Sequence, residues 1–438
     1  MFADQPPYLH ITDLVAGNLP NVFTPSLDAR SGTPPVFQLC APPTGFVANC
    51  PVVDTSNVTL NEAGGVVGQR SNVGGHTSQY KLGQVYEWTL SVQQQIRNNL
   101  ILEANYSASV AHHLPVYNQD LNRFAGDLIL NNGSLTRLNP NFATVAYATS
   151  DGNSVGNFGS LSLTRQYSQG LAIRGIYTFG KALDEPLSNS GSIDAGSVVP
   201  TTQSGPIYQN GNFYAQRGRS DYDIRQQFAA EGVWTVPSSY SSAALRHILG
   251  GWQFAGVWIL QTGLPFTVVN TAAFSPVCSG NATPVNGGCP SGSTIVGNSG
   301  GDYNADGANI DMPDVPAFGR HLSGKGKKDF LNGVFGPPAN GAAAAQFPPP
   351  PLGMEGNLGR NTYDNEGYNN FNLTVEKFFS TPWFFQEKLR CEVKGEFINL
   401  FNRVNLTNVS NSMSAGNFGQ ATGQLNPRYF QLHLRASF

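Results

Sequence analysis

The sequence predicts an all-β fold, an antiparallel transmembrane β-barrel to which this chain contributes about nine or ten long strands. Three observations lead to this prediction. Apolar and polar residues alternate with a period of two in many segments, which is typical of strands. These segments are about ten residues long or more, enough to cross a bilayer at a tilt. The connections between them alternate between shorter and longer, as in outer-membrane barrels.

The alternation defines the two faces of the expected sheet. Nine segments show it: residues 85–96, 99–109, 157–168, 170–181, 224–236, 251–263, 368–379, 387–400 and 428–438. We expect the convex, lipid-facing side to carry Leu90, Trp258, Leu432 and Leu434. We expect the concave side to carry Gln93, Gln253, Gln431 and Arg435. A register error of one residue would exchange the two sets.

The long connections set the expected domain organisation and orientation. They fill residues 110–156, 182–223, 264–367 and 401–427. Outer-membrane barrels have short periplasmic turns and longer extracellular loops, so the final strand is expected to run toward the periplasm. Residues 1–84 are then a loop-rich extracellular segment that follows strands further upstream, and residues 85–438 are the barrel portion. Because the first and last strands run in the same direction, we expect either an open sheet or a barrel completed by sequence outside this chain.

Composition and motifs argue against several function classes. Asp, Glu, Lys and Arg make up 12% of the residues, against roughly 25% in typical soluble domains. The net charge is −3, and no basic patch points to nucleic acid. No apolar run is long enough for a transmembrane helix, and no signal peptide is visible. No G-x-S-x-G motif occurs, and the pair His112 and His113 has no carboxylate at metal spacing, so we expect no enzyme.

Four of the five cysteines form two close pairs in loop segments. Cys40 and Cys50 lie in a Pro-rich stretch, and Cys278 and Cys289 lie in a stretch rich in Gly, Ser and Pro. Close pairs in loops favour two local disulfides formed in an oxidising compartment. The alternative is four unpaired thiols. Cys391 lies in a strand segment and is expected to be free.

One long loop contains a candidate calcium site. The candidate ligands are Asp302, Asn304, Asp306 and Asp311. Carboxylate and amide oxygens at alternating positions, followed by Gly307, are typical of the start of a calcium-binding loop. The bidentate Glu of an EF-hand would fall on Pro313, so the loop is not an EF-hand. The alternative is an ordinary turn rich in Asn and Asp, and no other cofactor is expected.

Two charged segments are expected to line the lumen. Charges of both signs occur at Arg217, Arg219, Asp221, Asp223 and Arg225, and at Arg390, Glu392, Lys394 and Glu396. A Lys or Arg that faces lipid at the bilayer midplane costs about 2–4 kcal/mol. We therefore expect inward salt-bridge ladders, which are structural rather than ligand-binding.

Four segments resemble the C-terminal barrel of Oar-like TonB-dependent receptors. They are residues 177–184 (YTFGKALD), 217–228 (RGRSDYDIRQQF), 356–379 (GNLGRNTYDNEGYNNFNLTVEKFF) and 389–406 (LRCEVKGEFINLFNRVNL). The resemblance covers roughly residues 80–438 and is specific only when the segments are taken together. One departure lies at Asn365, Glu366 and Gly367, where family members often carry Gly-Pro-Gly, so a different bend is expected there.

The resemblance implies a receptor or transporter of the bacterial outer membrane that binds an extracellular ligand through its long loops for energised uptake. The implied partners are outer-membrane lipid, the barrel assembly machinery through Phe438, and TonB through upstream regions only. No plug domain or TonB box is recognisable in this chain, so energised transport is not expected of it alone. The class suggests oligosaccharides or peptides as ligands, but the sequence does not identify one.

Two alternatives remain at this point. The first is a surface adhesion or structural barrel of the outer membrane that transports nothing. The second is a secreted soluble β-protein that binds carbohydrate, such as a propeller, which predicts repeats of about 40–50 residues. Such repeats are not visible in the sequence.

Overall fold

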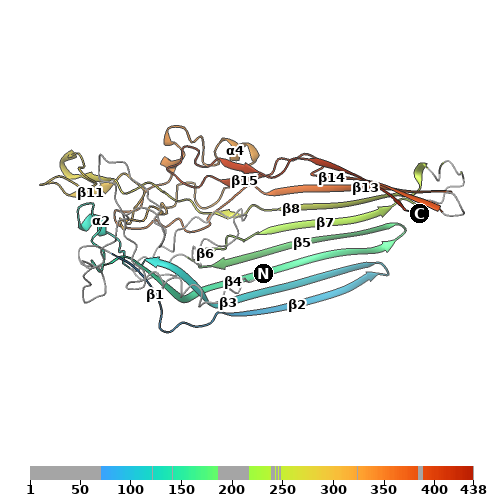
Figure 1. The fold of residues 1–438 in the computed structure, drawn as a ribbon, viewed down its shortest axis with the longest axis horizontal. Helices are drawn as coiled ribbons and strands as arrows, with labels where there is room; N and C mark the ends of the chain where they lie inside the picture. The colour runs from blue at the N-terminus through green and yellow to red at the C-terminus, as the bar shows by residue number, and fades with distance from the viewer. Residues whose placement is uncertain are drawn as a thin grey trace, which may run out of the picture.

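A single large sheet dominates the protein. The computed structural model describes residues 71–120, 122–140, 142–185, 217–237, 242, 245, 248–322, 324–382 and 388–437. Within these residues, one sheet of 11 strands runs along the molecule (Figure 1). No helix in this part of the chain is both long and apolar enough to cross a membrane.

The main path of the sheet is antiparallel throughout. Its order is β17-β14-β13-β8-β7-β5-β4-β3-β2. The bounds are β2 (Gln84–Arg97), β3 (Leu100–Asp120), β4 (Phe142–Ser168), β5 (Leu171–Asp184), β7 (Gln226–Thr235), β8 (Trp252–Gln261), β13 (Tyr368–Pro382), β14 (Lys388–Ile398) and β17 (Tyr429–Ser437). Each of the nine predicted segments is a strand, and the predicted fold class is confirmed.

Two short strands join the sheet beside this path. β1 (Ser71–His76) pairs with β4 in parallel, and β6 (Gly218–Arg219) pairs with β5. β1 lies in the segment 1–84 that we expected to be loop, whose first 70 residues fall outside the described part of the chain. β2 and β17 form the two ends of the path, and the described residues show no pairing between them. The sheet is therefore open, as expected.

The two ends of the sheet differ in their connections. Tight turns join β2 to β3 and β4 to β5 at one end, which we call the turn end (Figure 1). Gln169 and Gly170, in the turn between β4 and β5, have φ angles of 53° and 82°. Two successive positive φ angles characterise the type I′ turn, whose twist matches that of paired strands. The opposite, long-loop end carries the long connections.

The register confirms the predicted division of residues between two faces. Directly paired residues of neighbouring strands share a face. When the paired residues are followed from strand to strand, Leu432, Trp258 and Leu90 lie on the same face of the sheet. The same ladders place Gln93, Gln253, Gln431 and Arg435 together on the other face. We call these the apolar face and the polar face.

The apolar face is not covered by other parts of the described chain. Leu90, Leu432 and Leu434 expose 65%, 58% and 72% of their surface. Soluble monomers rarely expose a continuous apolar patch of this kind, so another apolar phase must cover it.

Large aromatic residues gather near both ends of the apolar face. Tyr86, Trp88 and Phe179 lie toward the long-loop end, and Trp234 and Trp252 lie toward the turn end. Rings at these two levels match the aromatic girdles that flank the hydrocarbon layer in membrane barrels.

The polar face carries the second predicted charge ladder. Arg390, Glu392, Lys394 and Glu396 pair with residues of the polar face of β17. Lys394 forms an ion pair with Glu396, and His433 approaches Glu396 at 3.4 Å. The predicted interior position of these charges agrees with the register.

The predicted loop 110–156 is largely wrong. β3 continues to Asp120 and β4 begins at Phe142, so strand replaces both ends of this loop. The pairing of β3 with β4 shifts register three times between Ala111 and Gln119. Such bulges insert unpaired residues and break the period-two pattern by which we recognised strands.

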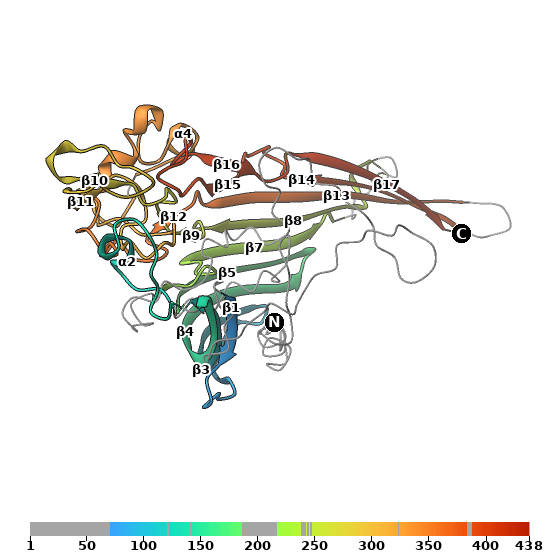
Figure 2. The ribbon, with the colours of Figure 1, turned by 60° about the vertical axis from the view of Figure 1, so that its left-hand side comes forward.

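The remaining long connections fold into a layer of short elements at the long-loop end (Figure 2). These are β9 (Pro265–Phe266), β10 (Pro276–Cys278), β11 (Ile295–Asn298), β12 (Tyr363–Asp364), β15 (Leu406–Val409), β16 (Ala421–Gln424), α2 (Asp127–Leu130), α4 (Lys327–Asn332), η2 (Ser279–Asn281), η3 (Ala339–Gly341) and η4 (Ala344–Gln346). The segments 264–367 and 401–427 are thus connections, as predicted, but hydrogen-bonded ones. We call this region the loop layer.

The loop layer has its own aromatic core. Phe335 lies at its centre, 5.1 Å from Phe418 and 5.0 Å from Phe347 between ring centroids. The core residues are Phe266, Val268, Phe330, Val334, Phe335, Ala343, Phe347, Leu358, Tyr363, Leu406, Val409 and Phe418. Residues 341–351 contribute Ala343 and Phe347 to this core. Their Ala- and Pro-rich composition concealed this contribution.

Candidate ligand-binding cleft

A buried arginine joins the loop layer to the sheet. The side chain of Arg360 is only 6% exposed and pairs with Asp184, at the end of β5, and with Asp221 at 3.3 Å. Burial lowers the pKa of Arg360 to about 10, so the guanidinium stays charged at neutral pH. These pairs hold the segment before β12 against the strand ends.

The charged segment 217–225 belongs to the same network of salt bridges, which we call the Arg360 network. Arg219 pairs with Asp223 at 2.8 Å and with Asp364 at 2.7 Å. Arg225 reaches Asp223 at 3.2 Å. The predicted salt bridges are present, but several partners come from the segment around β12 instead of from the ladder itself. The sequence revealed the charged residues of this segment, but it could not reveal partners that are distant in the sequence.

A cleft of about 340 Å³ lies between the long-loop end of the sheet and the loop layer. Gln227, Gln261 and Tyr368, on β7, β8 and β13, line it from the sheet. They occupy one row of the polar face, because Gln261 pairs with both of the others. Thr407 and Asn408 of β15 line it from the loop layer.

The cleft combines apolar side chains, such as Leu264 and Leu406, with amide and hydroxyl groups, and it contains little unpaired charge. Gln227 donates from Nε2 to Gln261 Oε1 at 3.2 Å. The lining contains two carboxylates, those of Asp221 and Glu366. Each already has a cationic partner, Arg360 at 3.3 Å for Asp221 and Arg403 at 3.7 Å for Glu366. The arrangement therefore suits a neutral ligand, with both polar and apolar groups, better than an ion.

The departure from Gly-Pro-Gly noted in the sequence shapes this cleft. Asn365 accepts a hydrogen bond from the amide of Val409 at 2.9 Å, and Glu366 accepts one from the amide of Leu406 at 3.1 Å. Asn365 also donates from Nδ2 to the carbonyl of Leu264 at 2.8 Å. Gly and Pro have no such side-chain groups, so these two residues fix β15 as the wall of the cleft.

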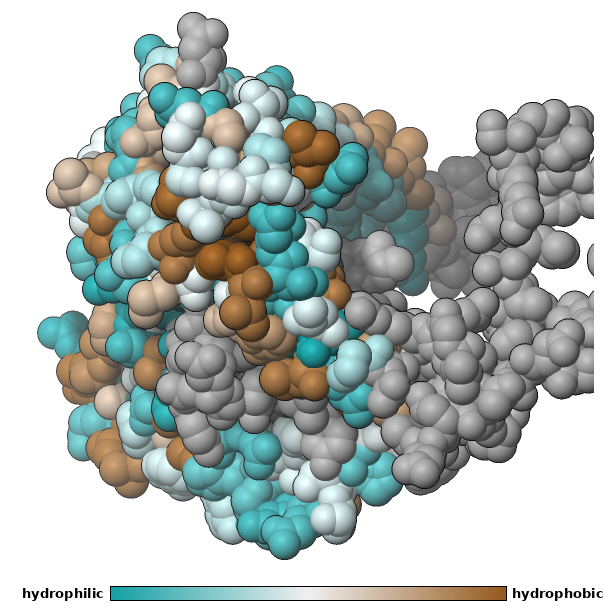
Figure 3. Space-filling view, turned by 90° about the vertical axis from the view of Figure 1, so that its left-hand side faces the viewer, coloured by the Kyte–Doolittle hydropathy of each residue, from teal (hydrophilic) through white to brown (hydrophobic). Residues whose placement is uncertain are grey.

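A second, more open cleft of about 870 Å³ adjoins the first and shares Gln261 with it. Phe228 and Leu260, which pair with each other on the apolar face, belong to its lining. Lysines of the α4 region line its other side, namely Lys325, Lys327 and Lys328. The surface at this end alternates hydrophobic and hydrophilic patches (Figure 3).

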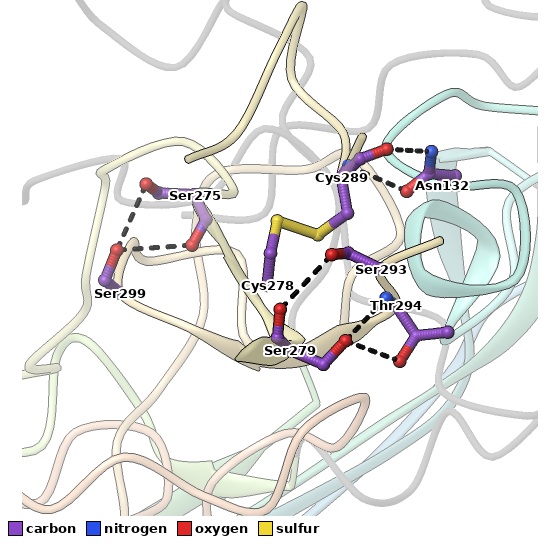
Figure 4. The surroundings of a disulfide bond; sticks show 8 residues. All are labelled: Asn132, Ser275, Cys278, Ser279, Cys289, Ser293, Thr294 and Ser299. Atoms are coloured by element: carbon purple, nitrogen blue, oxygen red, sulfur yellow. Dashed lines mark hydrogen bonds between the residues drawn. A yellow bond between two sulfur atoms is a disulfide. The ribbon is translucent and has the colours of Figure 1, made fainter. Parts of the chain in front are cut away.

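One of the two candidate disulfides is present in the loop layer. Cys278 of β10 is bonded to Cys289, and the Asn132 side chain bonds to the Cys289 backbone with two hydrogen bonds of 2.8 Å (Figure 4). The other candidate pair, Cys40 and Cys50, lies outside the described residues. Cys391 is free and half-buried.

The structure gathers the residues of the candidate calcium site. Asp302, Asn304, Asp306 and Asp311 are all buried, with 0%, 1%, 7% and 0% of their surface exposed. Asp302 accepts hydrogen bonds from the amides of Asp306 and Gly307. In the described part of the chain, no three Asp, Glu, His or Cys side chains already surround a common point as metal ligands do.

Sequence reasoning missed two important residues of the long-loop end. Glu355 lies beside the acidic loop, where its carboxylate accepts the amide of Met312 at 2.6 Å. Arg360 lies in a segment singled out only for its resemblance to a family. Neither residue is part of a local sequence motif, because the partners of both residues are far away in the sequence.

A family comparison now agrees with the open sheet, its exposed apolar face and its layer of long loops. A family described as "outer membrane beta barrel domain" matches residues 1–431. The chain belongs to this family. Membership places this barrel domain in the bacterial outer membrane, as predicted, and excludes the secreted soluble alternative. The apolar face is therefore the lipid-facing one.

A comparison with solved structures found distant matches. They include the crystal structure of the outer membrane transporter YddB from Escherichia coli, with 11% sequence identity and a TM-score of 0.39. The match covers 84% of this chain and 34% of that one, so the chain spans about a third of the transporter's length. No curated protein matches this barrel domain.

Proposed function

We propose that this barrel belongs to a TonB-dependent receptor of the Oar-like kind, which binds an extracellular ligand through its loop layer for energised uptake. The observation that carries the proposal is the cleft between the loop layer and the polar face. The long-loop end is then the extracellular end, because outer-membrane barrels carry their longer loops there. The domain acts without catalysis, and TonB engages regions outside this chain.

The lining of the cleft supports a neutral, hydroxyl- or amide-rich ligand. Gln227, Gln261 and Asn408 offer both donors and acceptors, and Tyr368 adds an aromatic ring. Oligosaccharides and short peptides have this chemistry. The lysines of the second cleft share its lining with Phe228 and Leu260 of the apolar face, and they suit the anionic headgroups of outer-membrane lipid.

The proposal is tested in the bacterium that carries the gene. A deletion strain is compared with its parent for growth on single oligosaccharides and short peptides as carbon source. We expect the deletion to abolish growth on one group of these compounds, and loss of TonB to have the same effect. Unchanged growth on all of them, together with reduced attachment to surfaces, would instead support the adhesion or structural alternative.

A pair of glutamine substitutions tests the cleft itself. Gln261→Met removes an amide from the row that lines the cleft, and uptake of the identified compound is expected to fall about fivefold or more, since a lost polar contact to ligand costs about 1–3 kcal/mol. Gln253→Met is the matched control. It lies on the same strand and face, eight residues away toward the turn end. Equal uptake by both variants would show that the cleft does not hold the ligand.

A further inference from the structure

Four carboxylates are buried together in the loop layer. Asp302 and Asp311 have no exposed surface, and Asp306 retains 7%. The fourth is Glu355, whose side chain is half-buried but whose carboxylate oxygen Oε2 is enclosed. Burial raises the pKa of Asp302 and Asp311 to about 7, and burial together with the nearby charge of Asp311 raises the pKa of Glu355 well above its usual value. Ionised carboxylates leave water at a high cost unless a proton or a cation compensates them.

Two oxygen atoms of this cluster have no partner. Asp311 Oδ1 and Glu355 Oε2 are both buried without a hydrogen bond. Among the described residues, no Lys, Arg or His forms an ion pair with Asp302, Asp311 or Glu355. Buried polar atoms are nearly always satisfied in folded proteins. The carboxyls of Asp311 and Glu355 face each other, so either a shared proton or a cation between them would satisfy both oxygens.

We propose that Asp302, Asn304, Asp306 and Asp311 bind one calcium ion together with Glu355. Calcium takes six to eight oxygen ligands from carboxylates, amides and carbonyls. Because three carboxylates do not yet surround a common point, binding draws Asp311 and Glu355 toward the segment 302–306. Glu355 thereby supplies the carboxylate that an EF-hand would carry at the position of Pro313.

The ion would tie two segments of the connection 264–367 together, the acidic loop 302–311 and the segment around Glu355. The acidic loop already receives backbone hydrogen bonds from the α2 segment, with Gly126 donating to Asn304 at 2.7 Å. It also receives one from Gly356, which donates to the carbonyl of Met312 at 3.0 Å. Calcium would add strong bonds between the acidic loop and the segment around Glu355. A dissociation constant of about 10⁻⁴–10⁻³ M is expected, as for other extracellular calcium modules.

Terbium luminescence tests the site in the full-length protein in detergent. Terbium replaces calcium, and the ring of Tyr303, between two of the proposed ligands, can sensitise its emission. We expect emission that calcium displaces. The double variant Asp311→Asn with Glu355→Gln should weaken terbium and calcium binding on the order of 100-fold or more, since even the partners of metal ligands are worth 10–100-fold.

Asp314→Asn is the matched control, because Asp314 lies in the same loop and also accepts a backbone amide, that of Asn357, at 3.0 Å. It should bind terbium as the unmodified protein does. In calcium-free buffer the double variant should melt no lower than the unmodified protein, since it removes two buried charges, so loss of binding cannot be ascribed to unfolding. Absence of displaceable emission in the unmodified protein, or equal emission from the double variant, would overturn the proposal. A proton shared by Asp311 and Glu355 would then explain how the two carboxylates are buried.

Discussion

Leu434→Arg is expected to destabilise the membrane-inserted barrel by about 2–4 kcal/mol, the cost of an Arg on the lipid face near the bilayer midplane. Leu434 lies on the apolar face of β17, near the middle of that strand, and 72% of its surface is exposed to its surroundings. In lipid those surroundings are hydrocarbon, which cannot solvate a guanidinium. The measurement is a urea titration of the full-length protein in lipid vesicles, followed by heat-modifiable gel mobility.

His433→Arg is the matched control for this substitution. His433 is the preceding residue, lies on the polar face and approaches Glu396 at 3.4 Å. An Arg there keeps a cationic partner for Glu396, so the stability should change by less than about 1 kcal/mol. If His433→Arg destabilised the barrel and Leu434→Arg did not, the two faces would be assigned the wrong way round.

Arg360→Met is expected to loosen the loop layer by about 3 kcal/mol, the lower end of the 3–5 kcal/mol that follows removal of one partner from a buried ion pair. The lower end applies because Asp221 is 42% exposed, so solvent screens its pair, whereas Asp184 is 19% exposed. Amide hydrogen exchange in peptides that cover residues 217–223 and 356–364 should then accelerate on the order of 100-fold.

Arg320→Met serves as the comparison for Arg360→Met. Arg320 is exposed and donates only to the backbone carbonyls of Asn357 and Leu358. Its loss should cost about 1 kcal/mol or less. Equal exchange rates in the two variants would mean that the Arg360 network of salt bridges does not hold the loop layer on the sheet.

The strands of the sheet were predictable because their signal is local. In β17, Leu432 and Leu434 alternate with Gln431 and Arg435, and this pattern alone set the face of each residue. The pattern failed in the extension of β3 beyond Ala111, where bulges interrupt the alternation. A period-two pattern cannot reveal a strand across bulges, because bulged residues do not alternate between the two faces.

The sites at the long-loop end were predictable only where their residues are close in sequence. The spacing of Asp302, Asp306 and Asp311 indicated an acidic loop, and the structure brings these residues together. Glu355 and Arg360 reach their partners across 40 residues or more, as Met312 to Glu355 shows at a separation of 43. No period or spacing encodes such contacts, which arise only when the loop layer packs around Phe335.

The register of the sheet requires the even-numbered residues of β8 to face lipid and the odd-numbered ones to face the lumen. Nitroxide labels placed one at a time at positions 253–258 of the full-length protein in lipid vesicles, with Cys40, Cys50 and Cys391 replaced by Ala, measure this orientation directly. We predict that labels at 254, 256 and 258 collide most with oxygen, which concentrates in hydrocarbon. Labels at 253, 255 and 257 should collide most with a water-soluble nickel chelate. The opposite alternation, or no period of two at all, would contradict the account.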